Sequence, residues 1–262
     1  MKKISNSHSI HNLLKRFPTS CIKFNVFTFL ILAIGVCLGI ILFIPQTLLP
    51  TLSERVFPNN TTTHPPSKFT VVIDPGHGGR DPGKVGTAGT LEKDINLKIA
   101  LYLKEMLESQ DIEVIMTRNE DKDLATTSTN FKSSDMKERV ALIKKSNADA
   151  VVSIHQNSYT DPKVYGAQCF YYTNSEEGEK LASILQKQII SSTNQTKIRE
   201  IKNNSDYYLL KHSTLPTVIV ECGFLSNPDE EKLLLNDGYQ RKMAWAIHLG
   251  ILQYLNQSES GF

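Results

Sequence analysis

The feature that most limits the fold of this sequence is an alternation, after residue 68, of short apolar runs with amphipathic helical segments. The apolar runs are rich in β-branched residues and end in turn residues, as residues 69–74 end at Pro75 and Gly76. The helical segments carry apolar residues three and four positions apart, as in residues 92–109. Strands that are apolar on both faces and alternate with helices are typical of layered α/β domains. We therefore predict one α/β domain over residues 68–262, with a twisted, mostly parallel sheet flanked by helices.

The same patterns give the order of the elements. Strands are predicted at residues 69–74, 112–117, 148–154, 167–172 and 217–220. Helices are predicted at residues 92–109, 135–146, 176–191, 228–235 and 239–255. We expect Asp135 and Glu138 to form a capping pair at the start of their helix. Residues 117–134 form a long polar loop, and loops of that length are often functional or mobile.

The first 67 residues differ in composition from the rest of the chain. The whole chain has a formal net charge of +2, whereas residues 1–23 carry +5 and residues 66–262 carry −3. This balance gives no reason to expect nucleic-acid binding. Residues 26–44 contain no charge. A helix of that length spans about 28 Å, close to the roughly 30 Å of a bilayer's hydrocarbon core.

We predict that residues 26–44 form one N-terminal transmembrane helix. A basic cytoplasmic tail at residues 1–25 precedes it, and a Pro-, Thr- and Asn-rich linker at residues 45–67 follows it. The positive flank predicts that the domain lies outside the cytoplasm. A cleaved signal peptide is the main alternative, although the residues after 44 offer no small-residue cleavage site. A buried globular helix is the other alternative.

Cysteine usage is compatible with an exported domain that has an ordinary hydrophobic core. Four cysteines exclude a disulfide-dense scaffold, and no C-x-x-C spacing suggests a structural zinc finger. Cys169 and Cys222 fall in the predicted domain, where we expect buried thiols. A bridge between them is the alternative, and it needs Cα atoms within about 7 Å of each other.

Side chains able to bind a metal follow three of the predicted strands. His77 follows the first strand, His155 the third and Glu221 the last. Ligands bind beyond the carboxyl ends of strands in open α/β sheets, so we expect these side chains to share one edge of the sheet. A second glutamate, Glu92, opens the helix after the first loop.

Two neutral imidazoles and one carboxylate suit an open zinc site with water in the fourth position. Zinc lowers the pKa of bound water from about 15.7 to roughly 7, and a second carboxylate can move its proton. The spacing leaves open which of Glu92 and Glu221 is the ligand. Iron is an alternative metal, because two histidines and a carboxylate also form a facial triad. Each residue also has a structural interpretation, such as the favourable place of Glu92 at a helix N-terminus.

Four ordered motifs resemble the zinc-dependent N-acetylmuramoyl-L-alanine amidases of bacterial cell walls, the amidase-3 family. They are VVIDPGHGG at 71–79, LEKDINL at 91–97, SIHQNS at 153–158 and VIVECGFLSNPDE at 218–230. The resemblance covers nearly all of residues 69–255. It implies a hydrolase that cleaves the amide between the lactyl group of N-acetylmuramic acid and L-alanine in peptidoglycan. It also implies Zn²⁺ as cofactor, with His77, Glu92 and His155 as ligands and Glu221 as the catalytic acid–base group.

The resemblance gives weaker indications for two further residues. Asn157 stands where the family often has Asn, and we expect it to orient a ligand or contact substrate. A turn-forming role is the alternative for this residue. Arg118 is expected to bind a stem-peptide carboxylate, with a structural ion pair as the alternative. The run from Gln156 to Ser158 departs from the small residues common in the family, which leaves the substrate contacts open.

The anchor, the loop before residue 135 and the segment GAQCFYY at 166–172 are similar to a spore-cortex subgroup of that family. This subgroup removes stem peptides so that muramic-δ-lactam forms, the mark read during germination. Some of its members act with a sporulation lipoprotein. The similarity implies cortex peptidoglycan as substrate and a location in the forespore intermembrane or cortex space. A zinc hydrolase that cuts another bond and a binding module without turnover stay open as alternatives.

Overall fold

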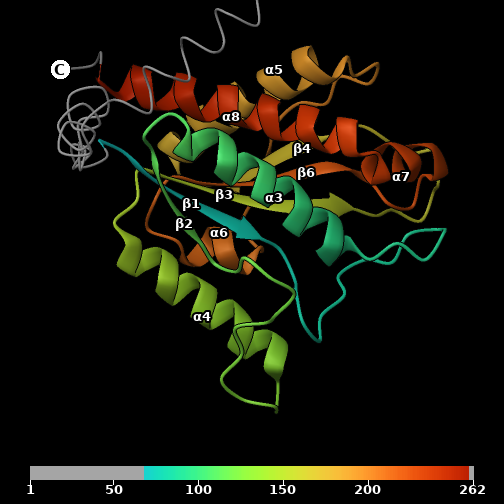
Figure 1. Cartoon of the computed structure of the whole chain (residues 1–262), viewed down its shortest axis with the longest axis horizontal. Helices are drawn as coiled ribbons and strands as arrows, with labels where there is room; N and C mark the ends of the chain where they lie inside the picture. The colour runs from blue at the N-terminus through green and yellow to red at the C-terminus, as the bar shows by residue number, and fades with distance from the viewer. Residues whose placement is uncertain (1–67, 260–262) are drawn as a thin grey trace, which may run out of the picture. The chain divides into compact units, whose positions relative to one another are not determined.

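The computed structural model describes residues 68–259. The predicted tail, membrane segment and linker lie outside the described residues, and within 68–259 no helix is long and apolar enough to cross a bilayer. The strands are β1 Thr70–Pro75, β2 Glu113–Met116, β3 Ala150–Asn157, β4 Gln168–Tyr172, β5 Lys202–Asn204 and β6 Thr217–Phe224. The helices (Figure 1) are α3 Glu92–Glu108, α4 Phe131–Ser146, α5 Glu176–Thr193, α6 Tyr208–His212, α7 Pro228–Leu235 and α8 Asp237–Glu259.

The described strands form one mixed sheet in the order β2-β1-β3-β6-β4-β5. All neighbours are parallel except β4 and β6, which are antiparallel. The predicted α/β domain is confirmed. The antiparallel pair arises because residues 158–167, between β3 and β4, contain no helix. Parallel strands need a longer crossover, so here the chain returns in the opposite direction.

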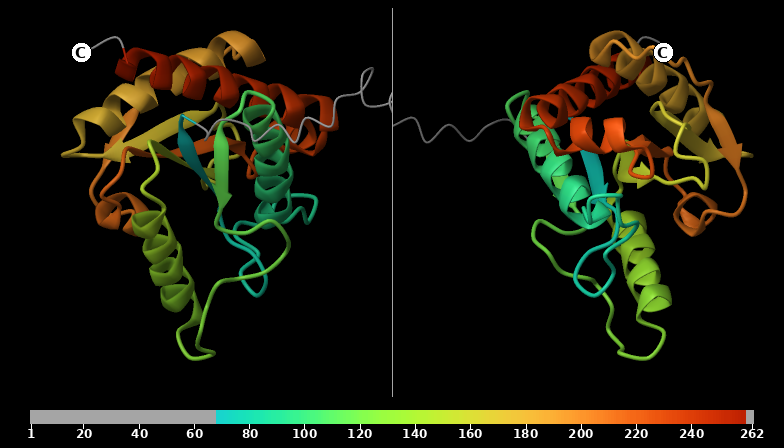
Figure 2. Two further views of the ribbon diagram at one scale, coloured as in Figure 1. Left: turned by 60° about the vertical axis from the view of Figure 1, so that its left-hand side comes forward. Right: turned by 90° about the vertical axis from the view of Figure 1, so that its right-hand side faces the viewer.

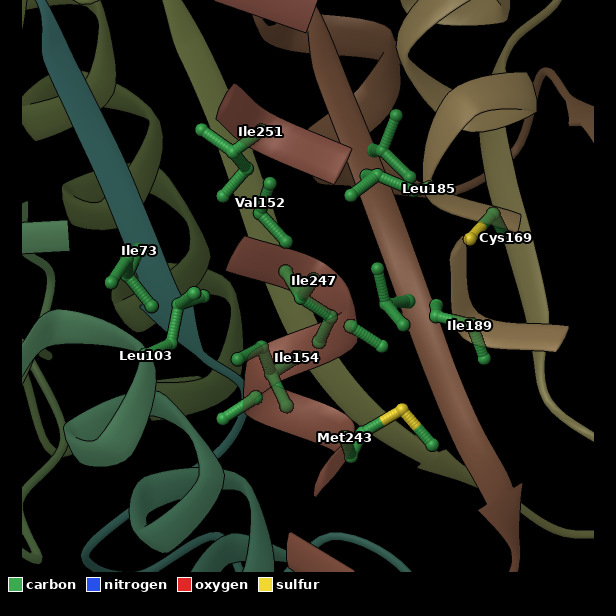
Figure 3. Packing of buried hydrophobic residues seen from close by; sticks show 14 of the residues in the cluster. Ile73, Leu103, Val152, Ile154, Cys169, Leu185, Ile189, Met243, Ile247 and Ile251 are labelled. Carbon is green, nitrogen blue, oxygen red and sulfur yellow. The ribbon is translucent and has the colours of Figure 1, made fainter. Parts of the chain in front are cut away.

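Helices cover both faces of the sheet (Figure 2). The larger core lies between the sheet and the helices α3, α5 and α8, and Figure 3 shows part of it. There Ile73 of β1 and Val152 of β3 pack with residues such as Leu103 and Ile247. A smaller cluster on the other face joins Val72 and Val151 to helices α4 and α6. Because side chains alternate along a strand, the buried strands must be apolar on both faces, as the sequence predicted.

The alternation that builds the two cores also collects polar groups on one face. Asp74 lies two residues after Val72 on β1, and His155 lies four residues after Val151 on β3. Both side chains therefore share the face of the sheet that α4 and α6 cover in part. Polar residues on this face lie toward the carboxyl ends of the strands, where the apolar cluster ends. This leaves a polar region beside the smaller core.

Helix α4 differs from its prediction. It begins at Phe131 rather than residue 135, and its N-cap residue Asn130 has a left-handed backbone, with no side-chain cap. The predicted capping pair of Asp135 and Glu138 is therefore wrong. Asp135 lies inside the helix, where it accepts a hydrogen bond at 2.7 Å from Nε of Arg139. Asp135 therefore belongs to a buried ion pair with Arg139 and does not start the helix.

Strands β3 and β6 run further than predicted, so His155 and Glu221 belong to the strands rather than to loops after them. Two short elements, β5 and α6, were not predicted. The sequence of β5 is three polar residues, KNN, and α6 has five residues, so neither gives a periodic apolar signal. Cys169 and Cys222 are buried and free, as expected.

Candidate metal centre and active site

His77, Glu92 and His155 meet at the carboxyl ends of β1 and β3. One ligand atom from each lies within 4.8 Å of the other two. The two imidazole rings are 5.0 Å apart between centroids and meet edge to face. The chain leaves β1 toward β2 on one side and reaches β3 on the other. This switch in strand order is where open α/β sheets place their ligands.

The loop after β1 orients His77. The backbone of His77 has a φ of 62°, an uncommon value for a residue with a side chain. Its Nδ1 lies 2.7 Å from Oδ2 of Asp81, while its Nε2 lies 3.2 Å from Oε2 of Glu92. With the Nδ1 proton directed to Asp81, the Nε2 lone pair is free for a metal. Asp81 was not predicted, although a carboxylate four residues after a histidine in a glycine-rich loop is a usable signal.

Glu92 is the first residue of α3 and is 1% exposed. Its Oε2 accepts a hydrogen bond at 2.7 Å from the backbone N–H of Lys84, and its Oε1 accepts one at 3.1 Å from that of Gln156. The same Oε1 lies 2.9 Å from Nδ1 of His155. Burial opposes ionisation, but the hydrogen bonds and charges of His155 and His77 outweigh it and hold the pKa of Glu92 well below its ordinary value. Glu92 is therefore a carboxylate in this site.

Two glycines allow these groups to approach each other. A Cβ on Gly76 would lie 2.2 Å from Cε1 of His155. Gly83 has a φ of 71°, and a Cβ there would lie 2.6 Å from Oε2 of Glu92. Any larger residue at either position would displace a predicted ligand. The glycine-rich loop thus has a direct steric function at the centre.

Arg139 of α4 supports the loop that carries His77. This arginine is 1% exposed, and its Nη1 lies 2.6 Å from Oδ1 of Asp74, which is 2% exposed. Its Nη1 and Nη2 also donate hydrogen bonds to the carbonyls of Pro75 at 2.9 Å and His77 at 2.6 Å. Burial raises the pKa of Asp74, but the charge of Arg139 and hydrogen bonds from Ser153 and Thr117 outweigh this effect and lower the pKa to about 2. A buried ion pair therefore fixes the backbone that carries His77.

Arg118, predicted to contact substrate, has a supporting position in the structure. It is 1% exposed, and its Nε donates to the carbonyl of Pro75 at 2.9 Å. Its Nη2 donates to the carbonyls of Gly76 at 3.0 Å and Lys93 at 2.8 Å. Burial, with the charge of Arg139, lowers the pKa of Arg118 to about 10. These bonds tie the loop after β1 to helix α3, and the guanidinium does not line the cavity described next.

Glu221 stands beside the three predicted ligands. It pairs with His155 in the register of β3 and β6, so the two side chains share one face of the sheet. Glu221 is 7% exposed, and its Oε2 is buried without a hydrogen-bond partner among the described residues. Burial raises the pKa of Glu221 to about 7, with the charge of Glu92 adding to the rise and that of His155 opposing it. The side chain is thus held ready to exchange a proton.

These groups open into a cavity of about 540 Å³ on the face of α4 and α6. His77, Glu92, His155 and Glu221 line it, together with Asn157. The Oδ1 of Asn157 accepts a hydrogen bond at 2.8 Å from the N–H of Ser158. Its predicted part in substrate contact stays a prediction. The far wall includes side chains that were not predicted, namely Lys84, Lys132, Met136, Tyr207 and Tyr208.

The donor set fits a zinc ion. Zinc bonds of 2.0–2.1 Å in a tetrahedron separate neighbouring ligand atoms by about 3.3 Å. The Nε2 of His77 lies 3.2 Å from Oε2 of Glu92, and the Nδ1 of His155 lies 2.9 Å from Oε1, so each histidine nitrogen is near that separation from one of the two carboxylate oxygens. Two imidazoles with one carboxylate also leave a coordination position for water or substrate. The unpartnered Oε2 of Glu221 lies in the same cavity wall.

The family model for N-acetylmuramoyl-L-alanine amidases matches residues 71–253 of this chain. The chain belongs to this amidase family. This chain is 41% identical over 191 residues to the germination-specific N-acetylmuramoyl-L-alanine amidase of Bacillus subtilis. That match covers 71% of this chain and 80% of the relative. The family resemblance drawn from four sequence motifs is confirmed.

Solved structures of amidases share its fold. The CwlD amidase of Clostridioides difficile, solved in complex with the GerS lipoprotein, matches with a TM-score of 0.70 and 42% identity. The match covers 72% of this chain and 98% of that one. The amidase AmiC2 of Nostoc punctiforme matches with a TM-score of 0.64 and 34% identity, over 72% of this chain and 97% of its own. The described domain is therefore the unit that these amidases have in common.

Proposed function

We propose that this amidase uses Zn²⁺ to hydrolyse the amide between the lactyl group of N-acetylmuramic acid and the L-alanine of the stem peptide. The observation that carries the proposal is the convergence of His77, Glu92 and His155 beside Glu221 in one cavity. Membership of the family supports the choice of bond. The geometry supports the choice of metal, because the donors have the chemistry and spacing that zinc needs.

His77, Glu92 and His155 would hold the ion. When bound, zinc supplies a Lewis acid that polarises the scissile carbonyl and lowers the pKa of water. Asp81 keeps Nε2 of His77 directed toward the site through its contact with Nδ1. The backbone N–H groups of Lys84 and Gln156 hold the carboxylate of Glu92 in place. The protein therefore presents its ligands without needing to rearrange them.

Glu221 is proposed as the acid–base group. Its Oε2 has no partner among the described residues, so it is available to accept the proton of the attacking water. The same carboxyl group then donates that proton to the nitrogen of L-alanine as the amide bond breaks. In this proposal the scissile bond lies between the ligands and Glu221, and the departing peptide lies on the β6 side of the cavity.

We further propose that the substrate is the peptidoglycan of the spore cortex. Removal of stem peptides there would allow muramic-δ-lactam to form before germination. The support is the 41% identity to the germination-specific amidase of Bacillus subtilis. The similar CwlD amidase was solved with the GerS lipoprotein, which supports a sporulation lipoprotein as partner for this amidase as well.

The proposed location follows from the sequence. Residues 1–25 would form a cytoplasmic tail, residues 26–44 a membrane anchor and residues 45–67 a linker to the catalytic domain at 68–262. The catalytic domain would then work outside the cytoplasm, in the forespore intermembrane or cortex space. Mapping the mature N-terminus tests this arrangement, because a terminus beyond residue 44 would exclude the anchor.

Digestion of purified cortex peptidoglycan tests the proposed function. The full-length chain is incubated with the peptidoglycan and zinc, and the products are analysed by mass spectrometry. We expect free peptides with N-terminal L-alanine, and none with Glu221→Gln prepared in the same way. Products cut within the stem peptide would show that the enzyme attacks another bond. Intact peptidoglycan, with the protein folded and loaded with zinc, would contradict the proposal unless the lipoprotein restores cleavage.

A further inference from the structure

A second hollow adjoins the catalytic cavity. It has a volume of about 680 Å³ and shares Asn157 and Tyr207 with the cavity that holds Glu221. The side chains of this second hollow, called here the basic groove, come from β4, β5, the ends of β3 and β6, and the segments around them. They are Asn157, Tyr159, Lys163, Val164, Tyr165, Gln168, Phe170, Lys197, Arg199, Lys202, Asn204, Tyr207 and Phe224.

The sheet carries the groove away from the acid–base group. Glu221 of β6 faces Gln168 of β4 in the strand register, and Phe170 of β4 faces Lys202 of β5. Lys202 is thus two strands across and two residues along from Glu221. With strands about 4.8 Å apart and a rise of about 3.3 Å per residue, the two Cα atoms are roughly 12 Å apart. An extended peptide covers that distance in three to four residues.

The charges of the groove have one sign. Its lining contains Lys163, Lys197, Arg199 and Lys202 and no acidic side chain. Within residues 68–259 none of these four forms an ion pair, and the three lysines are exposed. Two cations that line the catalytic cavity, Lys132 and Arg139, instead pair with aspartates. Unpaired cations gathered in a hollow attract an anionic ligand.

One cation of the groove is held in place while the others are free to adjust. The Nε of Arg199 donates to the carbonyl of Tyr165 at 2.8 Å, and its guanidinium lies 4.9 Å from the ring centroid of Phe224. Tyr159, Tyr165 and Tyr207 expose 59%, 40% and 36% of their surface. Exposed tyrosines provide apolar contact and a hydroxyl together. The groove therefore suits a ligand that has carboxylates and a peptide backbone.

We propose that the basic groove binds the acidic peptide part of the substrate through its free carboxylates. This inference rests on the proposed function. Glu221 gives its proton to the departing nitrogen, so the peptide attached to that nitrogen leaves on the side of β6, where the groove begins. Lys163 and Lys202 contact the free carboxylates of that peptide, and Arg199 forms the fixed part of the floor.

A pair of substrates with equal shape and different charge tests the groove. The first is N-acetylmuramoyl-L-alanyl-γ-D-glutamyl-meso-diaminopimelate, and the second has its peptide carboxylates converted to carboxamides. The full-length wild type is compared with the double variant Lys163→Gln, Lys202→Gln. The control is Lys145→Gln, Lys187→Gln, which removes two exposed lysines on α4 and α5 that line no described cavity.

The wild type should prefer the carboxylate substrate, and this preference in kcat/KM should fall about tenfold in the groove variant, as expected for two exposed ion pairs. The loss should lie in KM and should shrink in high salt. The control variant should keep the wild-type preference. Binding of the free peptide, measured by calorimetry, should weaken in the groove variant by a similar factor.

Each other outcome has a distinct meaning. If the wild type cleaves neither substrate but binds the free peptide through Lys163 and Lys202, the proposed reaction fails and the groove stands. If the wild type cleaves both equally well, or the groove variant keeps the wild-type preference, the groove proposal is overturned. Weakened binding of an anionic glycan-phosphate polymer by the groove variant, with peptide binding unchanged, would also overturn it.

Discussion

The loop that carries His77 and the basic groove both border the catalytic cavity, and they use cations in opposite ways. Arg118 and Arg139 are buried beneath the loop and donate hydrogen bonds to three successive carbonyls, from Pro75 to His77. The lysines of the groove are exposed and form no ion pair within the described residues. Buried arginines fix backbone geometry before any ligand arrives. Exposed lysines leave the geometry free and contribute charge.

The comparison predicts which changes the protein tolerates. Breaking a buried ion pair leaves an uncompensated charge and costs about 3–5 kcal/mol. Removing an exposed charge costs about 0.2–1 kcal/mol for each pair that it forms. The metal loop should therefore be sensitive and the groove tolerant. The following changes test this difference, in order of expected effect.

Glu221→Gln should produce the largest effect. It removes the only group in the proposed mechanism that moves a proton, so kcat should fall by about 10²–10⁴-fold. Zinc content and the free energy of unfolding should stay close to wild type, because Oε2 of Glu221 has no partner to lose among the described residues. Cleavage of a muramoyl peptide, with zinc content measured on the same preparation, checks both parts. Activity close to wild type would remove Glu221 from the mechanism.

Arg139→Gln should destabilise the domain by about 3–5 kcal/mol. The change leaves Asp74 and Asp135 buried without their cation and frees the carbonyls of Pro75 and His77. Urea unfolding of the metal-free protein measures the loss. The matched control is Arg241→Gln, whose ion pair with Asp237 is about half exposed on both sides and should cost less than about 1 kcal/mol. Equal losses for the two variants would contradict the comparison.

Asp81→Asn should weaken zinc binding by about 10- to 100-fold. The carboxylate of Asp81 fixes the orientation and tautomer of His77, and an amide does this less well. Competition with a chromophoric chelator measures the affinity. Asp121→Asn serves as control, since Asp121 supports the same loop through the N–H of Gly79 without touching a predicted ligand. An unchanged affinity in Asp81→Asn would show that the contact does not tune the centre.

Acid should remove the contribution that Asp74 makes to the free energy of unfolding. Its pKa of about 2 lies below the ordinary 3.8, so its ionised form stabilises the fold. This contribution is fully present above about pH 4 and is lost as the pH falls toward 2. The difference in unfolding free energy between wild type and Asp74→Asn should therefore shrink by about 2 kcal/mol between pH 5 and pH 2. A difference that stays constant over this range would contradict the ion pair.

The sequence predicted the parts of the site that strand ends determine. His77 follows β1, and His155 and Glu221 lie in the second halves of β3 and β6, so their convergence could be expected from sheet geometry alone. Glu92 was different, because an acid at a helix N-terminus has an ordinary structural explanation. The family resemblance was needed to separate its role from that of Glu221.

The support around the ligands could not be predicted, because it depends on distant contacts. Asp74 and Arg139 are 65 residues apart in the chain, and Asp135 had another sequence interpretation as a helix cap. The basic groove was missed for a related reason. Its wall includes β5 and the residue before α6, and neither of these short elements has a periodic pattern.

Metal analysis of three purified proteins tests the central claim most directly. Full-length wild type, His77→Ala and Glu221→Gln are supplied with zinc, dialysed and measured by mass spectrometry of the metal. The account predicts about one zinc per chain in the wild type and in Glu221→Gln, and almost none in His77→Ala. Equal zinc in all three proteins, or none in a folded wild type, would contradict a centre built from His77, Glu92 and His155.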